Sequence, residues 1–248
     1  MQCGGRRNLR TYEGSVWRVV EAQHRNATRR LVDSDTEQEL LESLIDRVKP
    51  PVPAGPEFEG LHYLLFTPFR HPPLPHGSRF GTRAERSLFY GSEALETAMA
   101  ETAFYRLIFL EGTEAALSPL TLELSAFRVD VRTRAAVDLT RPPFDGHHRV
   151  IASRTRYEST QRLGAEMRAD GVELVRYPSA RDAGAEPNVA LFTARALMRK
   201  VPRAPETWRC VATRERVEMQ KLDWFEQRQL VFPRAQFEVG GALPAPAV

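Results

Sequence analysis

The chain of 248 residues contains little cysteine and no long hydrophobic run, and both absences exclude classes of protein. Cys3 and Cys210 are the only cysteines, and they stand in neither a metal-ligand spacing nor a disulfide framework. A membrane-spanning helix needs about 18 or more consecutive apolar residues, and no such run occurs. The polar, basic segment 1–14 also lacks the apolar stretch of a signal peptide. We therefore expect a cytoplasmic protein with reduced thiols, no metal site and no membrane partner.

An excess of charge of one sign is also missing. The 35 basic and 32 acidic residues leave a net charge of only +3. The basic cluster of Arg6, Arg7 and Arg10 lies near a terminus, whereas a nucleic-acid-binding protein concentrates basic residues on one element. We therefore expect no direct contact with nucleic acid. The sequence also lacks the Gly-x-Gly-x-x-Gly and Gly-Lys-Ser phosphate loops, so any dinucleotide site must be built without a Rossmann turn.

Local patterns in the first 70 residues predict one helix and one short strand. Ser34 and Glu37 form a capping box, which is typical of a helix start. The apolar face of this helix is expected to be buried and consists of Leu40, Leu41, Leu44, Ile45 and Val48. Pro50 ends the helix, because proline lacks the amide hydrogen. The apolar run 63–66 then predicts a strand.

The rest of the chain predicts a mixed fold. Strands are expected at 87–90, 121–124, 135–139, 172–177 and 188–192, and helices at 93–109 and 158–169. Ser92 is the expected N-cap of the first of these helices, and Gly171 is the expected end of the second. Because no regular β-α repeat occurs, the elements predict α and β structure around one sheet. Residues from Phe237 onward predict a disordered tail.

Four polar residues in characteristic surroundings carry a family resemblance. Arg79, Tyr90 and Glu101 follow one another at intervals of eleven residues, and Ser179 comes later in a Tyr-Pro-Ser-Ala-Arg segment. This pattern resembles the RES domain, a bacterial toxin family named for its arginine, glutamate and serine. The resemblance extends over about residues 12–225 and is strongest to a longer subfamily with an N-terminal extension. Many members have Trp-Asn after the arginine, where this chain has Phe80 and Gly81.

The resemblance implies a fold, an activity and a partner. The fold is α+β, with the split, mostly antiparallel sheet and flanking helices of ADP-ribosyltransferases in a single domain. The implied organisation is an N-terminal extension packed on the core (1–70), a catalytic core (71–200), C-terminal strands (201–236) and a flexible tail (237–248). The activity is consumption of NAD as a substrate, with no further cofactor. The partner is an Xre-like helix-turn-helix antitoxin that forms an oligomeric complex with the toxin and blocks its cleft.

The chemistry of NAD cleavage gives each residue a role. Nicotinamide leaves as a neutral molecule, so the difficult part is the positive charge that develops on the ribose. A fixed carboxylate stabilises this charge, and Glu101 is the candidate. Arg79 would hold the pyrophosphate, with Arg83 as a competitor for that role. Tyr90 would stack on nicotinamide or steer the ribose, and Ser179 would bind the sugar or the amide. Arg18 matches a second arginine of the family.

Three readings of this set stay open. The first is an NAD-degrading toxin that transfers ADP-ribose to water or phosphate. The second is a protein mono-ADP-ribosyltransferase, which needs the same four residues and a docking surface for its target. The third is a non-catalytic protein that binds its antitoxin or nucleic acid. Each residue taken singly also has a plain structural explanation, such as a surface ion pair for Arg79 or a core position for Tyr90.

Overall fold

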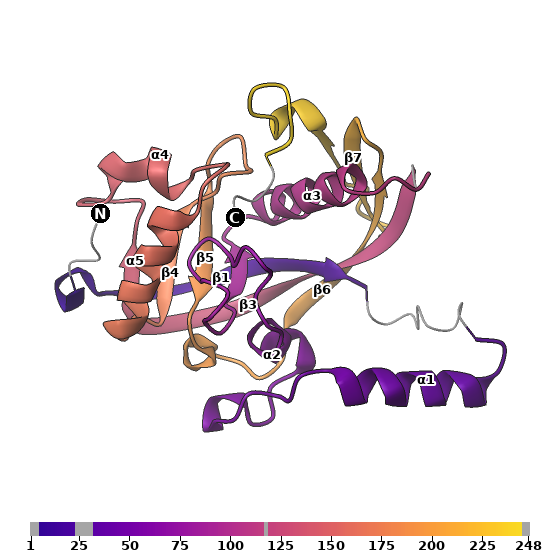
Figure 1. Ribbon diagram of the computed structural model, residues 1–248, viewed down its shortest axis with the longest axis horizontal. Helices are drawn as coiled ribbons and strands as arrows, with labels where there is room; N and C mark the ends of the chain where they lie inside the picture. Colours follow the sequence, from indigo (N-terminus) through magenta and orange to yellow (C-terminus); the bar gives the residue numbers. More distant parts are fainter. Residues whose placement is uncertain (1–4, 23–31, 117–118, 245–248) are drawn as a thin grey trace.

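The computed structural model describes residues 5–22, 32–116 and 119–244 (Figure 1). In this part of the chain, eight strands form one sheet. The strands are β1 (Arg10–Glu21), β2 (Phe89–Ser92), β3 (Leu120–Asp138), β4 (Leu174–Pro178), β5 (Pro187–Leu191), β6 (Arg203–Ala212), β7 (Arg216–Lys221) and β8 (Gln229–Pro233). The α-helices are α1 (Asp35–Val48), α2 (Tyr63–Arg70), α3 (Leu95–Glu111), α4 (His148–Ile151) and α5 (Glu158–Ala169).

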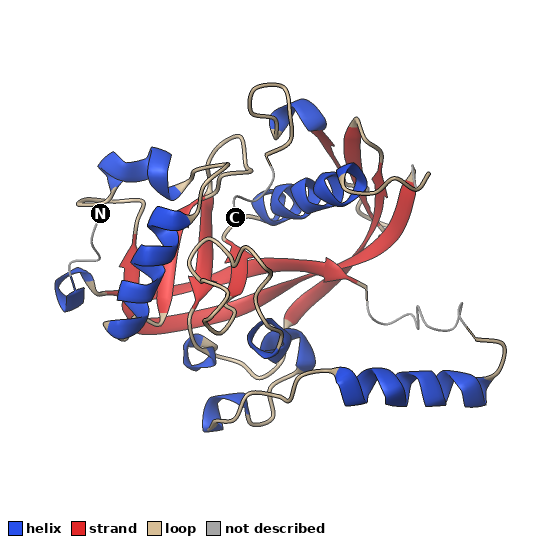
Figure 2. Cartoon of the chain, in the orientation of Figure 1, coloured by secondary structure: helices blue, strands red, loops and turns tan. Residues whose placement is uncertain are grey.

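The sheet is split along its longest strand, β3. One edge of β3 pairs with β1 over almost the whole length of both strands. The other edge pairs first with β6, over 120–128, and then with β4, over 136–138. The order β4-β5-β2-β1 leads back to β3 and makes a ring of five strands, while β6, β7 and β8 extend the sheet from the other half (Figure 2). Only the β3–β4 pairing is parallel. A single domain with a mostly antiparallel sheet and flanking helices confirms the predicted fold class.

Three groups of buried apolar side chains hold the elements together. Helix α3 packs on the extended half of the sheet through residues such as Met99, Phe104 and Leu107, which meet Trp208 and Met219. Helix α5 packs on the ring through Leu163 and Met167. The third group, which includes Val16, Phe127 and Leu174, connects strands of the ring to Leu65 and Phe69 of α2. Burial of this apolar surface is the main stabilising contribution to the fold.

Several sequence predictions are correct at the level of the element. The capping box at Ser34 is present, and α5 spans the predicted residues with Gly171 at a φ of 75°. Strands β4 and β5 lie at the predicted segments 172–177 and 188–192 and pair antiparallel. In contrast, the strands predicted at 121–124 and 135–139 are parts of the single strand β3. The polar residues between them lie on a strand because β1 supplies hydrogen-bond partners along its whole length.

Two predictions for the first 70 residues are wrong. Segment 63–66 belongs to helix α2, because Leu65 and Phe69 at i and i+4 both reach the core. The apolar side of α1 is largely exposed, since Leu40 and Val48 are 61% and 82% exposed, while Leu41 and Ile45 are half-buried. Near the other end of the chain, Phe237 is fully buried and packs against Phe104. Strand β1 lies within the sheet, between β2 and β3.

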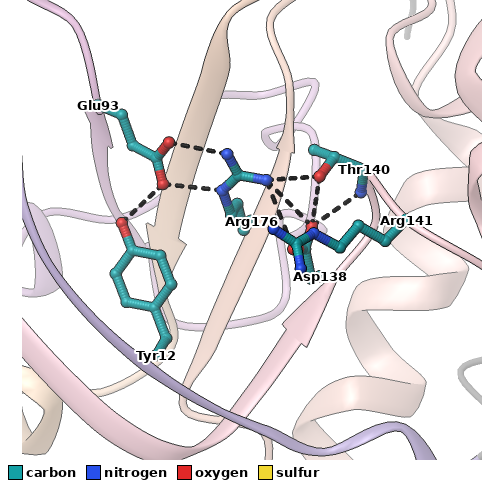
Figure 3. A network of polar contacts seen from close by, with 6 residues as sticks. All are labelled: Tyr12, Glu93, Asp138, Thr140, Arg141 and Arg176. Atoms are coloured by element: carbon teal, nitrogen blue, oxygen red, sulfur yellow. Dashed lines mark hydrogen bonds and ion pairs between the residues drawn. The ribbon is translucent and has the colours of Figure 1, made fainter.

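A polar network joins β1, β3, β4 and the start of α3 (Figure 3). Arg176 donates to both oxygens of Glu93, at 2.8 and 2.9 Å, and to the hydroxyl of Thr140 at 2.5 Å. Tyr12 donates to Glu93 at 2.8 Å, and burial together with this carboxylate raises the pKa of Tyr12, so its hydroxyl stays protonated. The paired carboxylate raises the pKa of Arg176 in turn. Because Glu93 directly follows β2, the network fixes the turn between β2 and α3.

Candidate active site

A cavity of about 310 Å³ opens between β1, β2 and α3. Its polar lining includes Arg18, Arg79, Tyr90, Glu101 and Asn188. The apolar and aromatic lining includes Trp17, Val19, Ala98, Tyr105, Tyr157 and Tyr177. Residues as far apart in the sequence as Trp17 and Asn188 therefore meet in one cleft. A concave site with a few convergent polar groups among aromatic side chains is the usual architecture of a small-molecule site.

Arg79 lies on a tight turn whose shape is set by hydrogen bonds to other elements. The Tyr90 hydroxyl accepts from the amide of Phe80 at 3.2 Å and donates to Ser78 Oγ at 2.9 Å. The Gln161 side chain on α5 donates to the carbonyls of His76 and Ser78, at 3.0 and 3.1 Å. The hydroxyl of Tyr90 is therefore engaged in holding the Arg79 turn, while the residue also lines the cavity.

The same turn depends on close approach of α5, which Gly164 permits. A Cβ at Gly164 would lie 2.1 Å from the carbonyl oxygen of Phe80. We therefore expect Gly164→Ala to lower the free energy of unfolding by about 1–3 kcal/mol, the usual range for overpacking. Chemical denaturation of the purified variant measures this loss. Gly146→Ala is the control, because a Cβ there meets nothing within 4 Å. Equal stability of the two variants would contradict the close approach.

The Arg79 side chain is buried at the wall of the cavity, with 8% of its surface exposed. Its Nη1 donates to the carbonyl of Ile151 at 2.7 Å, and the guanidinium lies 4.8 Å from the centre of the Tyr157 ring. Among the described residues, no carboxylate pairs with Arg79. The surface ion pair considered for this residue is therefore absent there. A buried guanidinium that has no paired carboxylate can bind an anionic ligand through charge-assisted hydrogen bonds.

Glu101 is the acidic residue in the lining of the cavity. Its Oε1 accepts hydrogen bonds from Ser179 Oγ and from Asn188 Nδ2, each at 2.6 Å. Ser179 is 2% exposed and itself accepts from the amides of Arg181 and Asp182, at 3.1 Å each. The structure therefore places Ser179 behind Glu101 and not in the lining, so its contact is with the carboxylate.

Asn188 and Ser92 belong to the site, although sequence reasoning assigned neither a role in it. Ser92 was expected to cap α3, but α3 begins at Leu95 and the cap position, Ala94, has no side-chain hydrogen bond. Ser92 is instead the last residue of β2, and its hydroxyl donates to Asn188 Oδ1 at 2.6 Å. The signal that could have revealed Asn188 is its place at the start of an otherwise apolar strand. A buried amide there requires partners.

The two other arginine candidates have different environments. Arg18 on β1 lines the cavity and donates to the carbonyl of Tyr90 at 2.6 Å, with its guanidinium 4.8 Å from the centre of the Phe89 ring. Burial lowers the pKa of Arg18 to about 10, so the side chain still carries its charge at neutral pH. Arg83 is exposed and is not part of the lining. Geometry therefore favours Arg79, with Arg18, over Arg83.

Aromatic side chains contribute five of the fifteen residues that line the cavity. Tyr90, Tyr157 and Tyr177 come from β2, the start of α5 and β4, while Trp17 and Tyr105 come from β1 and α3. Burial raises the pKa of Tyr90, so its hydroxyl stays protonated. Tyr105 and Tyr157 were not predicted as site residues, because single tyrosines near apolar positions are more often core. Phe80, which follows Arg79, is fully buried against Tyr177 and does not line the cavity.

The RES domain family matches residues 55–213, which is more than half of the chain. This chain is a member of the RES family. The match confirms the resemblance and leaves β1, α1, β7 and β8 of this RES protein outside the matched range. Among solved structures, this chain is similar to a chain of the M. tuberculosis MbcT-MbcA toxin-antitoxin complex, at 14% identity, with 84% of this chain and 88% of that chain covered and a TM-score of 0.46. No curated protein matches.

Two further observations concern the described part of the RES protein. No group of three or more His, Cys, Asp or Glu side chains there is arranged to hold a metal ion. No helix in the same ranges is long and apolar enough to cross a bilayer.

Proposed function

We propose that this RES protein is the toxin of a bacterial toxin–antitoxin pair and that it cleaves the bond between nicotinamide and ribose in NAD. The observation that carries the proposal is the pairing of one directed carboxylate, Glu101, with the buried cations Arg79 and Arg18 in one aromatic-walled cavity. Family membership supports the same conclusion.

The arrangement suits a reaction through an oxocarbenium ion. Nicotinamide leaves as a neutral base, so the site needs no general acid, unlike a sugar hydrolase with two carboxylates. Positive charge that develops on the ribose would be stabilised by Glu101, whose position is set before the reaction. Arg79 and Arg18 would bind the pyrophosphate. The tyrosine rings would stack on the nicotinamide, and their hydroxyl groups stay neutral where burial raises the pKa, as at Tyr90.

The direct test is incubation of the purified protein with NAD, followed by separation of the products. Free nicotinamide together with ADP-ribose would support hydrolysis, and ADP-ribose 1″-phosphate formed in phosphate buffer would support phosphorolysis. Unchanged NAD after prolonged incubation with a correctly folded protein would contradict the proposal.

A second candidate function is transfer of ADP-ribose to a protein. The same cavity would bind NAD, and only the acceptor would differ. The observation that favours it is the exposed apolar side of α1, where Leu40, Leu44 and Val48 are 61%, 47% and 82% exposed. Such a surface is typical of a protein contact. Incubation of the protein with labelled NAD and a bacterial lysate separates the two functions, because only transfer leaves label on a protein.

The proposed partner is a helix-turn-helix antitoxin that occupies the cavity. A site that presents the buried cations Arg79 and Arg18 favours a carboxylate or an acidic segment. We expect expression of the protein alone to stop growth and co-expression with the neighbouring helix-turn-helix gene to restore it. The purified pair should not cleave NAD. The Glu101→Gln variant, expressed alone, is the non-toxic control. A stable complex that cleaves NAD at the full rate would contradict occupation of the cavity.

A further inference from the structure

We infer that Asn188, held in orientation by Ser92, is a positioning residue that directs the carboxylate of Glu101. The inference rests on the proposed function, because it concerns the same carboxylate. The proposed NAD cleavage needs a carboxylate, two cations and an aromatic wall, and it does not require Asn188 or Ser92. The geometry around Glu101 assigns the additional role.

The orientation of the Asn188 amide follows from its neighbours. An ionised carboxylate only accepts hydrogen bonds, so the contact of 2.6 Å to Glu101 Oε1 must be made by the amino group of Asn188. The amide oxygen then faces Ser92, whose hydroxyl donates to it at 2.6 Å. Asn188 and Ser92 are 3% and 2% exposed, so water does not compete for these contacts. The hydroxyl of Ser92 thus fixes which end of the amide meets Glu101.

Ser179 completes the environment of the same carboxylate oxygen. Its oxygen accepts from two backbone amides, those of Arg181 and Asp182, and its own hydrogen is left to donate to Glu101 Oε1 at 2.6 Å. Glu101 Oε1 therefore receives two hydrogen bonds from buried donors. The other oxygen, Oε2, is the one left for a ligand in the cavity.

The backbone around Asn188 makes this arrangement rigid. Strand β5 lies between β2 and β4, and Asn188 is paired with Ser92 on one side and with Tyr177 on the other. The next residues along these neighbours, Glu93 and Arg176, form the ion pair of the polar network. Three strands and an ion pair therefore hold the Asn188 amide at a fixed distance from α3, which carries Glu101. Positions on paired strands are more exact than positions on loops.

The test is a set of variants measured by steady-state NAD cleavage. Asn188→Ala should lower kcat by about tenfold to a hundredfold, the range for one hydrogen bond to a charged group, with little change in KM. Ser92→Ala removes only a hydroxyl and should lower kcat by about threefold to tenfold. Thr97→Val is the control, since Thr97 lies on α3 outside the cavity and its buried hydroxyl has no partner in the described part of the chain.

A double variant separates positioning from a general structural effect. If Asn188 acts through Glu101, Asn188→Ala should cost nothing further in a Glu101→Gln protein. Equal losses in both backgrounds, or unchanged kcat in both Asn188→Ala and Ser92→Ala, would overturn the inference. If circular dichroism shows that Asn188→Ala is unfolded, the test rests on Ser92→Ala alone. A wild-type rate in Glu101→Gln would instead overturn the proposed function, which keeps the two failures distinct.

Discussion

Glu101→Gln should abolish nearly all NAD cleavage while the protein stays folded. The amide keeps the shape of the side chain but loses the charge that would stabilise a cationic ribose. We expect a loss of roughly a hundredfold or more in kcat, which is the scale for removal of one prearranged electrostatic group. The measurement is release of nicotinamide from NAD, with circular dichroism and a thermal melt to verify the fold.

Glu96→Gln is the matched control for this prediction. Glu96 lies on the same helix, but it is exposed, pairs with Arg228 and does not line the cavity. The same chemical change there should leave the rate unaltered. NAD turnover by Glu101→Gln at the wild-type rate would show that the carboxylate does not act in the reaction, and the proposed mechanism would then be wrong.

Arg79→Ala should weaken NAD binding about tenfold to a hundredfold. The variant loses a charge-assisted contact to the pyrophosphate, and such contacts contribute about 1.5–3 kcal/mol. Titration calorimetry in a Glu101→Gln background measures the affinity without consumption of NAD. The loss should also decrease at high salt, because part of the attraction is electrostatic.

Arg83→Ala tests whether the effect is specific to the cavity. Arg83 is four residues further along the chain and carries the same charge, but it is exposed and outside the lining. We expect unchanged affinity for this variant. An unchanged affinity in Arg79→Ala together with a large loss in Arg83→Ala would transfer the phosphate role to Arg83 and contradict the geometry described above.

Local sequence signals correctly predicted helix ends, because capping residues near each end determine where a helix starts and stops. The capping box at Ser34 starts α1, and Gly171 ends α5 because its φ of 75° suits glycine. The motif spacing also identified Arg79, Tyr90 and Glu101, and all three line one cavity. A resemblance can find these residues because the arginine, tyrosine and glutamate each stand in a recognisable short segment.

The tertiary structure decided what depends on contacts between distant segments. Whether 63–66 is helix or strand was settled by the core contacts of Leu65 and Phe69, since a short apolar run fits either. The same holds for Ser92, which reads as a helix cap but donates across the sheet to Asn188. Ser92 and Asn188 are 96 residues apart in the sequence and meet through strand pairing. No local sequence pattern predicts that pairing.

Within the site, the chemistry of the residues follows from the sequence, whereas the positions of their side chains follow from the tertiary structure. The sequence by itself determined which residue types could carry the chemistry, because a carboxylate, an arginine and a tyrosine have fixed chemical properties. Only the tertiary structure decided that Ser179 contacts Glu101 and not the cavity, that Arg83 points to solvent, and that Asn188 completes the carboxylate environment. Direction and burial of a side chain depend on all the elements packed around it, whereas its chemistry does not.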